Sequence, residues 1–173
     1  TDRNSRSKAR GQEVRRMIDQ IEASSTNDQA KSALDVFEMH SDVKVSIPAN
    51  EVFVPGTEQI RPRIYPMLDL IAAQARDIMV DKELSIEVRM SKDALCDPTF
   101  FRDGSCDRWL LTSYQAISLS RYIQNEGKLS PSKIIPVGRG ISPAAFVNAE
   151  ERAKNVASTV EFIYTTPPQS LRK

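Results

Sequence analysis

Few side chains in this sequence could form covalent bonds or bind a metal, and the two cysteines are among them. Cys96 and Cys106 flank a loop, residues 97–105, whose proline and glycine can bring its ends together. The chain has one histidine, His40, so it offers no plausible set of zinc ligands. We therefore predict a Cys96–Cys106 disulfide, which stabilises by about 2–3 kcal/mol and favours an oxidising compartment. The alternative is two unrelated free thiols in a cytosolic protein.

No arrangement of residues predicts catalysis. His40 lies beside Ser41 and Asp42, but the sequence arranges no nucleophile partner for it, and we expect it to be solvated or to cap a turn. The run Gly138-Arg139-Gly140 is too short for a phosphate loop and lacks the Lys-Ser/Thr pair of one. No acid–base pair or metal cluster stands out. We expect a protein that is not an enzyme, with no catalytic residues, no metal and no cofactor.

Composition excludes other classes. Lys+Arg number 24 and Asp+Glu 23, so no net field would attract nucleic acid. There is no run of about 18 apolar residues to span a bilayer and no signal peptide. The chain opens on Thr1, and we expect a mature form or an excised piece with a membrane segment upstream. At 173 residues and 40% hydrophobic, it can bury the core of one domain with an appendage.

The N-terminal part is expected to be a tether. Residues 1–11 are polar and basic and predict a disordered arm, with a phosphate or anionic-lipid patch as the alternative. Residues 12–41 show helical spacing of apolar side chains in two places, so we predict a helical linker, or helices that pack on the main core. The apolar positions are Val14, Met17, Ile18 and Ile21, then Ala30, Ala33, Leu34 and Phe37.

Residues 42–166 alternate between strand and helix patterns, followed by a flexible tail at 167–173. Strands are predicted at 43–47, 84–88, 134–137 and 159–164, from alternating or short apolar runs. Helices are predicted around Met67 to Ile78, from Thr112 to a C-terminal cap at Gly127, and after a cap at Asn148. The fold class is therefore α/β (α+β): a β-α-β-α-β mixed sheet with helices on one or both faces, preceded by the helical linker.

A series of short motifs runs along this region. The stretch 108–116 matches an Asn-Trp-x-Leu-Ser-x-x-Arg-Ala signature at its Trp, Leu, hydroxyl and Ala positions. Asp93 stands for the Asp of a strand-ending Gly-His-Thr-Asp. Further matches in order are Gly138, Gly140, Pro143, Asn148 and Val160-Glu161-Phe162. Together these motifs resemble the OmpA C-terminal-like family. The upstream stretch 48–60 is most similar to the B subunits of flagellar stators, the MotB-like proteins.

The resemblance implies a mixed-sheet sandwich that binds peptidoglycan. It further implies a homodimeric, MotB-like motor stator subunit in the periplasm of a Gram-negative bacterium, tethered to the inner membrane through an N-terminal segment. The alternative is a degenerate OmpA-like protein that binds another envelope or secretion-system protein. A lipid-anchored outer-membrane protein is a third possibility, and it would require an N-terminal lipidated Cys.

In that family an Asp and an Arg clamp the two ends of diaminopimelate, a zwitterion, in the wall peptide. Here Asp93 supplies the carboxylate, while Gln115 takes the place of the Arg. A turn or cap role for Asp93, and an ordinary helix surface for Gln115, are the alternatives. The final Asn-Arg-Arg-Val-Glu-Ile signature falls on residues 157–162, with Ser158 at an Arg position, or with a gap on 152–155. The cations expected near the site are Arg89, Arg108, Lys92, Arg102, Arg121 and Lys154.

Overall fold

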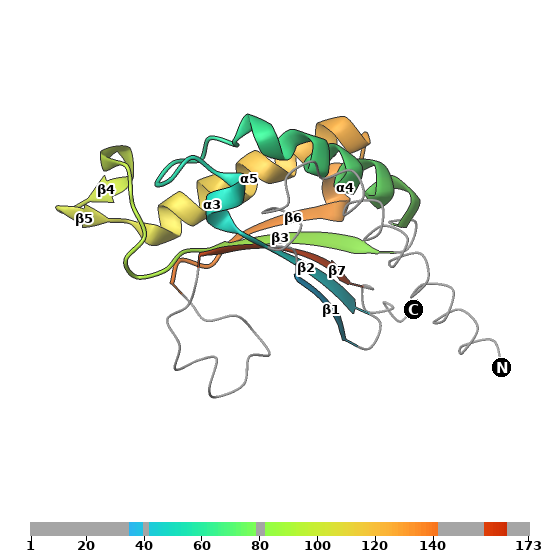
Figure 1. Cartoon of the computed structure of the whole chain (residues 1–173), viewed down its shortest axis with the longest axis horizontal. Helices are drawn as coiled ribbons and strands as arrows, with labels where there is room; N and C mark the ends of the chain where they lie inside the picture. Colours follow the sequence, from blue (N-terminus) through green and yellow to red (C-terminus); the bar gives the residue numbers. More distant parts are fainter. Residues whose placement is uncertain (1–34, 40–41, 79–81, 142–157, 166–173) are drawn as a thin grey trace, which may run out of the picture.

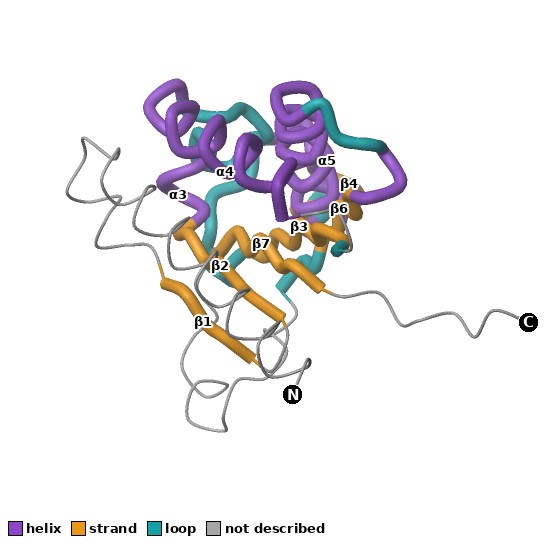
Figure 2. Tube along the Cα trace, turned by 90° about the vertical axis from the view of Figure 1, so that its right-hand side faces the viewer, coloured by secondary structure: helices purple, strands orange, loops and turns teal. Residues whose placement is uncertain are grey.

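Two layers make up this molecule, a sheet and a pair of helices that cover one of its faces (Figures 1 and 2). The computed structural model describes residues 35–39, 42–78, 82–141 and 158–165. Among these residues, no helix combines the length and the apolar character needed to cross a membrane. The predicted helices of 12–21 and after Asn148, the arm and the tail lie outside the described residues.

The sheet is mixed, as the sequence predicts. Its order is β1-β2-β7-β3-β6, in which β3 and β6 are parallel and the other neighbours antiparallel. A parallel pair needs a long crossover, and the chain between β3 and β6 supplies one through a helix. The strands are β1 (Asp35–Met39), β2 (Asp42–Pro48), β3 (Glu83–Arg89), β6 (Ile134–Gly138) and β7 (Thr159–Thr165).

The two long helices lie where the apolar spacing predicts them, whereas the short helix at 49–52 was not predicted. α4 spans Tyr65–Ile78 and α5 spans Arg108–Gly127; a short helix, α3, spans Ala49–Val52. Three 3-10 turns, Pro62–Ile64, Pro98–Phe100 and Pro131–Lys133, each begin with proline, whose missing N–H would be unpaired in a first turn. Both long helices pack on the same face of the sheet (Figure 2).

The core lies between the sheet and these helices. Alternate residues of each central strand point to one face, so a period-two apolar pattern gives that face its hydrophobic surface. Burial of this apolar area contributes roughly 25 cal/mol per Å². The strand residues buried on the helix side are Val45, Ile47, Leu84, Ile86, Val88, Val160, Phe162 and Tyr164.

The predicted second helix of the linker is wrong at its C-terminal end. Phe37 lies in β1, which pairs antiparallel with β2. Met39 and Asp42 form the last pair of these two strands. The sequence 35–39 satisfies both a helical and a strand pattern over so few residues, and the free edge of β2 decides between them. The remaining apolar positions of that predicted helix lie outside the described residues.

Helix α5 begins earlier than predicted. Asp107 caps it: its carboxylate accepts a hydrogen bond from Leu110 N at 3.0 Å. At the other end, Gly127 is the last helical residue, and it is Lys128 that adopts the left-handed conformation (φ 50°). Gly127 is required instead for a close approach, because a Cβ there would lie 3.0 Å from the carbonyl oxygen of Ala72.

The cysteine loop is closed by a disulfide between Cys96 and Cys106, as predicted. Within the loop, the turn Pro98–Phe100 leads into a small hairpin of β4 (Phe101–Arg102) and β5 (Ser105–Cys106). The hairpin projects from one end of the molecule, beside the start of α5 (Figure 1). The disulfide therefore shapes the surface at the end of β3 where Asp93 lies.

Candidate ligand-binding site

A cavity of about 300 Å³ opens where the C-terminal end of β3 meets the start of β7 and the side of α5. This volume is at the lower end of the range for small-molecule sites. Three of the residues selected from the sequence line it, namely Asp93, Gln115 and Ser158. The other lining residues are Ala49, Asn50, Phe53, Val54, Pro55, Gly56, Met90, Ser91, Ala94 and Leu95.

Asp93 lies in the turn that follows β3, and its side chain is exposed to solvent. Two backbone hydrogen bonds hold the chain leading to it: Met90 N donates to the Gly140 carbonyl at 2.8 Å, and Ser91 N donates to Ser158 Oγ at 2.8 Å. The carboxylate therefore stands on an anchored turn at the rim of the cavity, where it can accept a hydrogen bond from a cation.

Ser158 joins two sides of the cavity. Its hydroxyl accepts from Ser91 N, and its carbonyl accepts from Ala49 N at 2.9 Å. The start of β7 is thereby tied both to the turn after β3 and to α3. The ungapped register of the last signature had placed Ser158 at an Arg position, and the structure brings Ser158 to the same cavity as Asp93.

Gln115 is not an ordinary helix-surface residue. Only 6% of it is exposed, and its Nε2 donates to the Thr57 carbonyl at 3.0 Å. It projects from α5 toward the turn after α3, on the side of the helix that faces the cavity. The side chain is neutral, so it offers hydrogen bonds without charge.

One wall of the cavity is formed by the contact of the turn at Gly56 with the start of the cysteine loop. Asp97 N donates to the Gly56 carbonyl at 2.9 Å. Gly56 has a φ of +75°, and a Cβ on it would lie 3.1 Å from backbone atoms of Leu95, Cys96 and Asp97. Only glycine fits this conformation and this approach without strain. The disulfide-closed loop is thereby fastened to the segment before α4.

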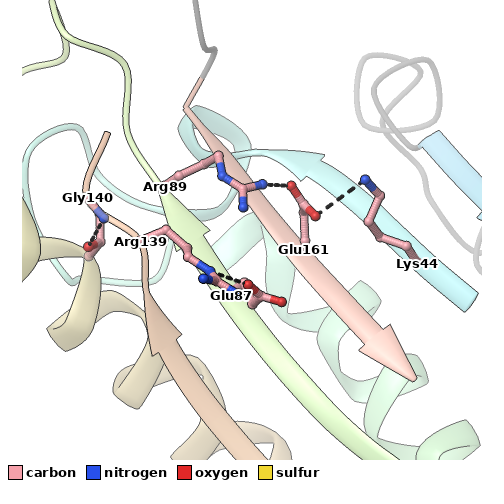
Figure 3. A network of polar contacts seen from close by, with 7 residues as sticks. Lys44, Glu87, Arg89, Arg139, Gly140 and Glu161 are labelled. Atoms are coloured by element: carbon pink, nitrogen blue, oxygen red, sulfur yellow. Dashed lines mark hydrogen bonds and ion pairs between the residues drawn. The ribbon is translucent and has the colours of Figure 1, made fainter. Parts of the chain in front are cut away.

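Arg89, a predicted site residue, does not line the cavity. Its guanidinium lies on the sheet face opposite the helices, only 3% exposed, and forms an ion pair with Glu161 (Figure 3). Lys44 lies 3.5 Å from the other oxygen of Glu161, and Arg139 pairs with Glu87 on the same face. Burial lowers the pKa of Arg89, and the negative charge of Glu87 acts in the opposite direction and raises it. These charges stabilise the back of the sheet.

Arg108 is also absent from the cavity lining, but it supports the turn that carries Asp93. Its guanidinium donates to the Lys92 carbonyl at 2.8 Å. The exposed side chains of Lys92, Arg102 and Arg121 are not among the lining residues either, and Lys154 lies outside the described residues.

Several lining residues were not selected from the sequence. Asn50 and Ser91 add polar groups, and Phe53 and Met90 form a buried floor. Asn50 and Phe53 lie in the stretch 48–60 that resembles the stator proteins, and Met90 and Ser91 align with the first two residues of the Gly-His-Thr-Asp signature. None of the four was predicted to be a site residue. Their position follows from the contacts of α3 and the turn after β3, which connect segments far apart in the sequence.

The electrostatic character of the cavity is set by one group. Of the described residues that line it, Asp93 is the only ionisable one. Metal binding finds no support in the described part of the chain, which contains no cluster of three His, Cys, Asp or Glu side chains. The arrangement favours a ligand that carries an ammonium group beside neutral hydrogen-bonding groups.

This architecture was compared with those of known proteins. No protein-family model and no curated protein sequence matches the chain. Among solved structures, a MotB-like protein from Desulfovibrio vulgaris has 17% identity and a TM-score of 0.61, covering 88% of this chain and 93% of its own. The cell wall anchor of the T6SS from Pseudomonas aeruginosa has 19% identity and a TM-score of 0.62, with coverage of 80% and 92%.

The periplasmic domain of Helicobacter pylori MotB is similar as well, at 14% identity and a TM-score of 0.62, covering 83% of this chain and 86% of that one. At identities this low, the structural similarity establishes a shared fold and nothing finer. The resemblance inferred from the motifs is thus confirmed at that level: this chain has the OmpA-like fold of the MotB periplasmic domains.

Proposed function

We propose that this chain is a non-catalytic anchor that binds peptidoglycan in the cavity beside Asp93. One observation carries the proposal. Asp93 matches a signature of a peptidoglycan-binding family, Gln115 and, in the ungapped register, Ser158 stand at Arg positions of two further signatures, and all three line the same cavity. These residues are 22 and 43 positions apart in the sequence, and the fold brings them together at a cavity of ligand size.

The chemistry of the cavity is consistent with weak binding of a wall peptide. Asp93 is exposed and available to pair with the ammonium of a diaminopimelate side chain. Gln115 would give the neighbouring carboxylate a hydrogen bond but no charge. A charge-assisted hydrogen bond is worth about 1.5–3 kcal/mol, so affinity for the zwitterion should be roughly ten- to a hundredfold below that of an Arg-containing site.

We further propose that the chain is the periplasmic part of a MotB-like stator subunit, in which the domain holds a membrane motor against the wall. The likeness to MotB periplasmic domains supports this role, and the disulfide suits an oxidising compartment. The proposal includes a homodimer in the Gram-negative periplasm, tethered to the inner membrane through an N-terminal segment.

The first prediction concerns wall binding. Purified chain should co-sediment with isolated sacculi, and Asp93→Ala should lower the bound fraction about tenfold, because the ammonium loses its only carboxylate partner. Glu126→Ala is the matched control: this carboxylate is exposed near the end of α5, is absent from the cavity lining and is expected to change nothing. Equal sedimentation of wild type and Asp93→Ala would refute binding at this cavity.

A second candidate function is binding to another envelope protein. The neutral Gln115 favours it, as do the apolar side chains at the rim, since Leu95 is 70% exposed and Val54 is 36% exposed. The variant Gln115→Arg separates the two functions. If wild type fails to sediment with sacculi and Gln115→Arg does sediment, the cavity keeps the geometry of a wall site and the natural partner is a protein.

A further inference from the structure

The charge of the cavity bears on which wall peptide it accepts. Asp93 contributes a carboxylate, and the other polar side chains in the described lining, Asn50, Ser91, Gln115 and Ser158, are neutral. Placing an anionic group beside these residues removes it from water, and none of the described lining side chains gives it a cation in return, which is costly. An ammonium with a neutral neighbour meets no such penalty.

The two nearby guanidinium groups are already engaged. Arg89 is buried against Glu161 on the opposite face of the sheet. Arg108 donates to the Lys92 carbonyl and holds the Asp93 turn. Moving either one into the cavity would break a contact that stabilises the structure around it, so neither is a ready substitute for an arginine at position 115.

The hydrogen-bonding capacity of Gln115 points the same way. One of its two N–H bonds is directed to the Thr57 carbonyl at 3.0 Å. The side chain then retains one N–H donor and its carbonyl acceptor. A ligand carboxamide can both accept from that N–H and donate to that carbonyl. A ligand carboxylate can only accept, and it faces the carbonyl oxygen with a like partial charge.

We infer that the cavity selects a wall peptide whose ammonium lies beside an amidated carboxyl group, in preference to one with a free carboxylate. This inference rests on the proposed function and deepens it, because it names the chemical form of the peptide. The ammonium pairs with Asp93, and the carboxamide exchanges hydrogen bonds with Gln115. A site with arginine at 115 would have the reverse preference, since a guanidinium fork binds a carboxylate in two places.

The test compares two soluble probes that differ in one group. They are the tripeptide L-alanyl-γ-D-glutamyl-meso-diaminopimelate and the same tripeptide amidated at the diaminopimelate carboxyl group whose carbon also bears the free ammonium. Dissociation constants are measured for the full chain by calorimetry or by NMR titration. We expect the amidated tripeptide to bind about tenfold more tightly than the free acid. The substitution Asp93→Ala should lower the affinity for both tripeptides. Equal affinities, or tighter binding of the free acid, would overturn the inference.

Gln115→Arg should reverse the preference, and its melting temperature shows whether it folds. The wild-type comparison does not depend on that variant. Sacculus sedimentation measured in parallel separates two failures. If sacculi bind through Asp93 but the probes are not distinguished, only the amide preference is wrong. If neither sacculi nor either probe binds, the proposed wall anchoring is wrong as well.

Discussion

Arg89 and Arg139 lie on the same face of the sheet, but water reaches them to different extents. The Arg89 side chain is 3% exposed and that of its partner Glu161 is 6% exposed, whereas the Arg139 side chain is 43% exposed. Removing one member of a buried ion pair leaves an uncompensated charge in a medium of low polarity. The Arg139–Glu87 pair should contribute less, because water reaches Arg139, although the Glu87 side chain is only 10% exposed.

We therefore expect substitutions of these two arginines to lower the stability of the fold by different amounts. Arg89→Met should lower the free energy of unfolding by about 3 kcal/mol, because the buried Glu161 carboxylate loses its guanidinium partner and, among the described residues, keeps the contact with Lys44. Arg139→Met should lower it by about 1 kcal/mol or less. Urea unfolding of the two variants checks this. Losses of equal size would mean that the buried pair contributes no more than the exposed one.

The misassignment of Arg89 has a physical explanation in the strand itself. Ile86 and Val88 face the helices, so Glu87 and Arg89 must face the other way. The cavity is on the helix side, because α5 contributes Gln115 to it. The alternation of β3 thus contained the signal that excludes Arg89, whereas proximity in sequence to Asp93 suggested the opposite.

At the scale of elements, the cysteine loop is the part of the site most open to perturbation. Ala94 and Leu95, which precede the disulfide, line the cavity, and Asp97 is fastened to Gly56. A cross-link over a loop of this length stabilises chiefly by restricting the unfolded chain. In this fold it also limits how far the cavity wall can move.

Replacing both cysteines by serine should lower the free energy of unfolding by about 2–3 kcal/mol. It should also weaken binding of the diaminopimelate tripeptides, because the wall formed by the loop becomes less ordered. Chemical unfolding and probe titration of the double variant measure the two effects, with Ser105→Ala, an exposed change within the same loop, as control. Unchanged stability would show that the contacts at Gly56 alone hold the loop.

Among the elements, long and strongly periodic segments were predicted well. β2, β3, β7 and α4 follow directly from their apolar spacing. The start of α5 was missed because Asp107, rather than a residue nearer Thr112, satisfies its first N–H groups. β1 was missed because pairing with β2 decides its conformation, and such pairing is not visible in five residues of sequence.

At the scale of the whole molecule, the net charge bears on whether wall binding is specific to the cavity or is adsorption through surface charges. The chain carries a formal charge of +1, so no broad positive field draws it to an anionic polymer. Of the described cavity lining, one side chain is ionisable, and a single exposed ion pair is screened only modestly by salt.

Raising NaCl from 0.05 to 0.5 M should therefore reduce sacculus binding by no more than about fivefold. Sedimentation at both salt concentrations, with Asp93→Ala alongside, tests this. A fall of several orders of magnitude, shared by the variant, would indicate adsorption through dispersed surface charges and would contradict recognition in the cavity.

By itself, the sequence predicted the fold class and the order of the main strands and helices along the chain, because these follow from local periodicity within a few residues. It favoured the disulfide over two free thiols. The resemblance to a known family singled out Asp93 and Gln115. The tertiary structure decided which side chains meet. Asp93, Gln115 and Ser158 share a cavity because β3, α5 and β7 converge at one end of the sheet, while Arg89 is turned to the opposite face. The contacts that bring them together join residues far apart in the chain, and such contacts depend on the packing of the whole fold.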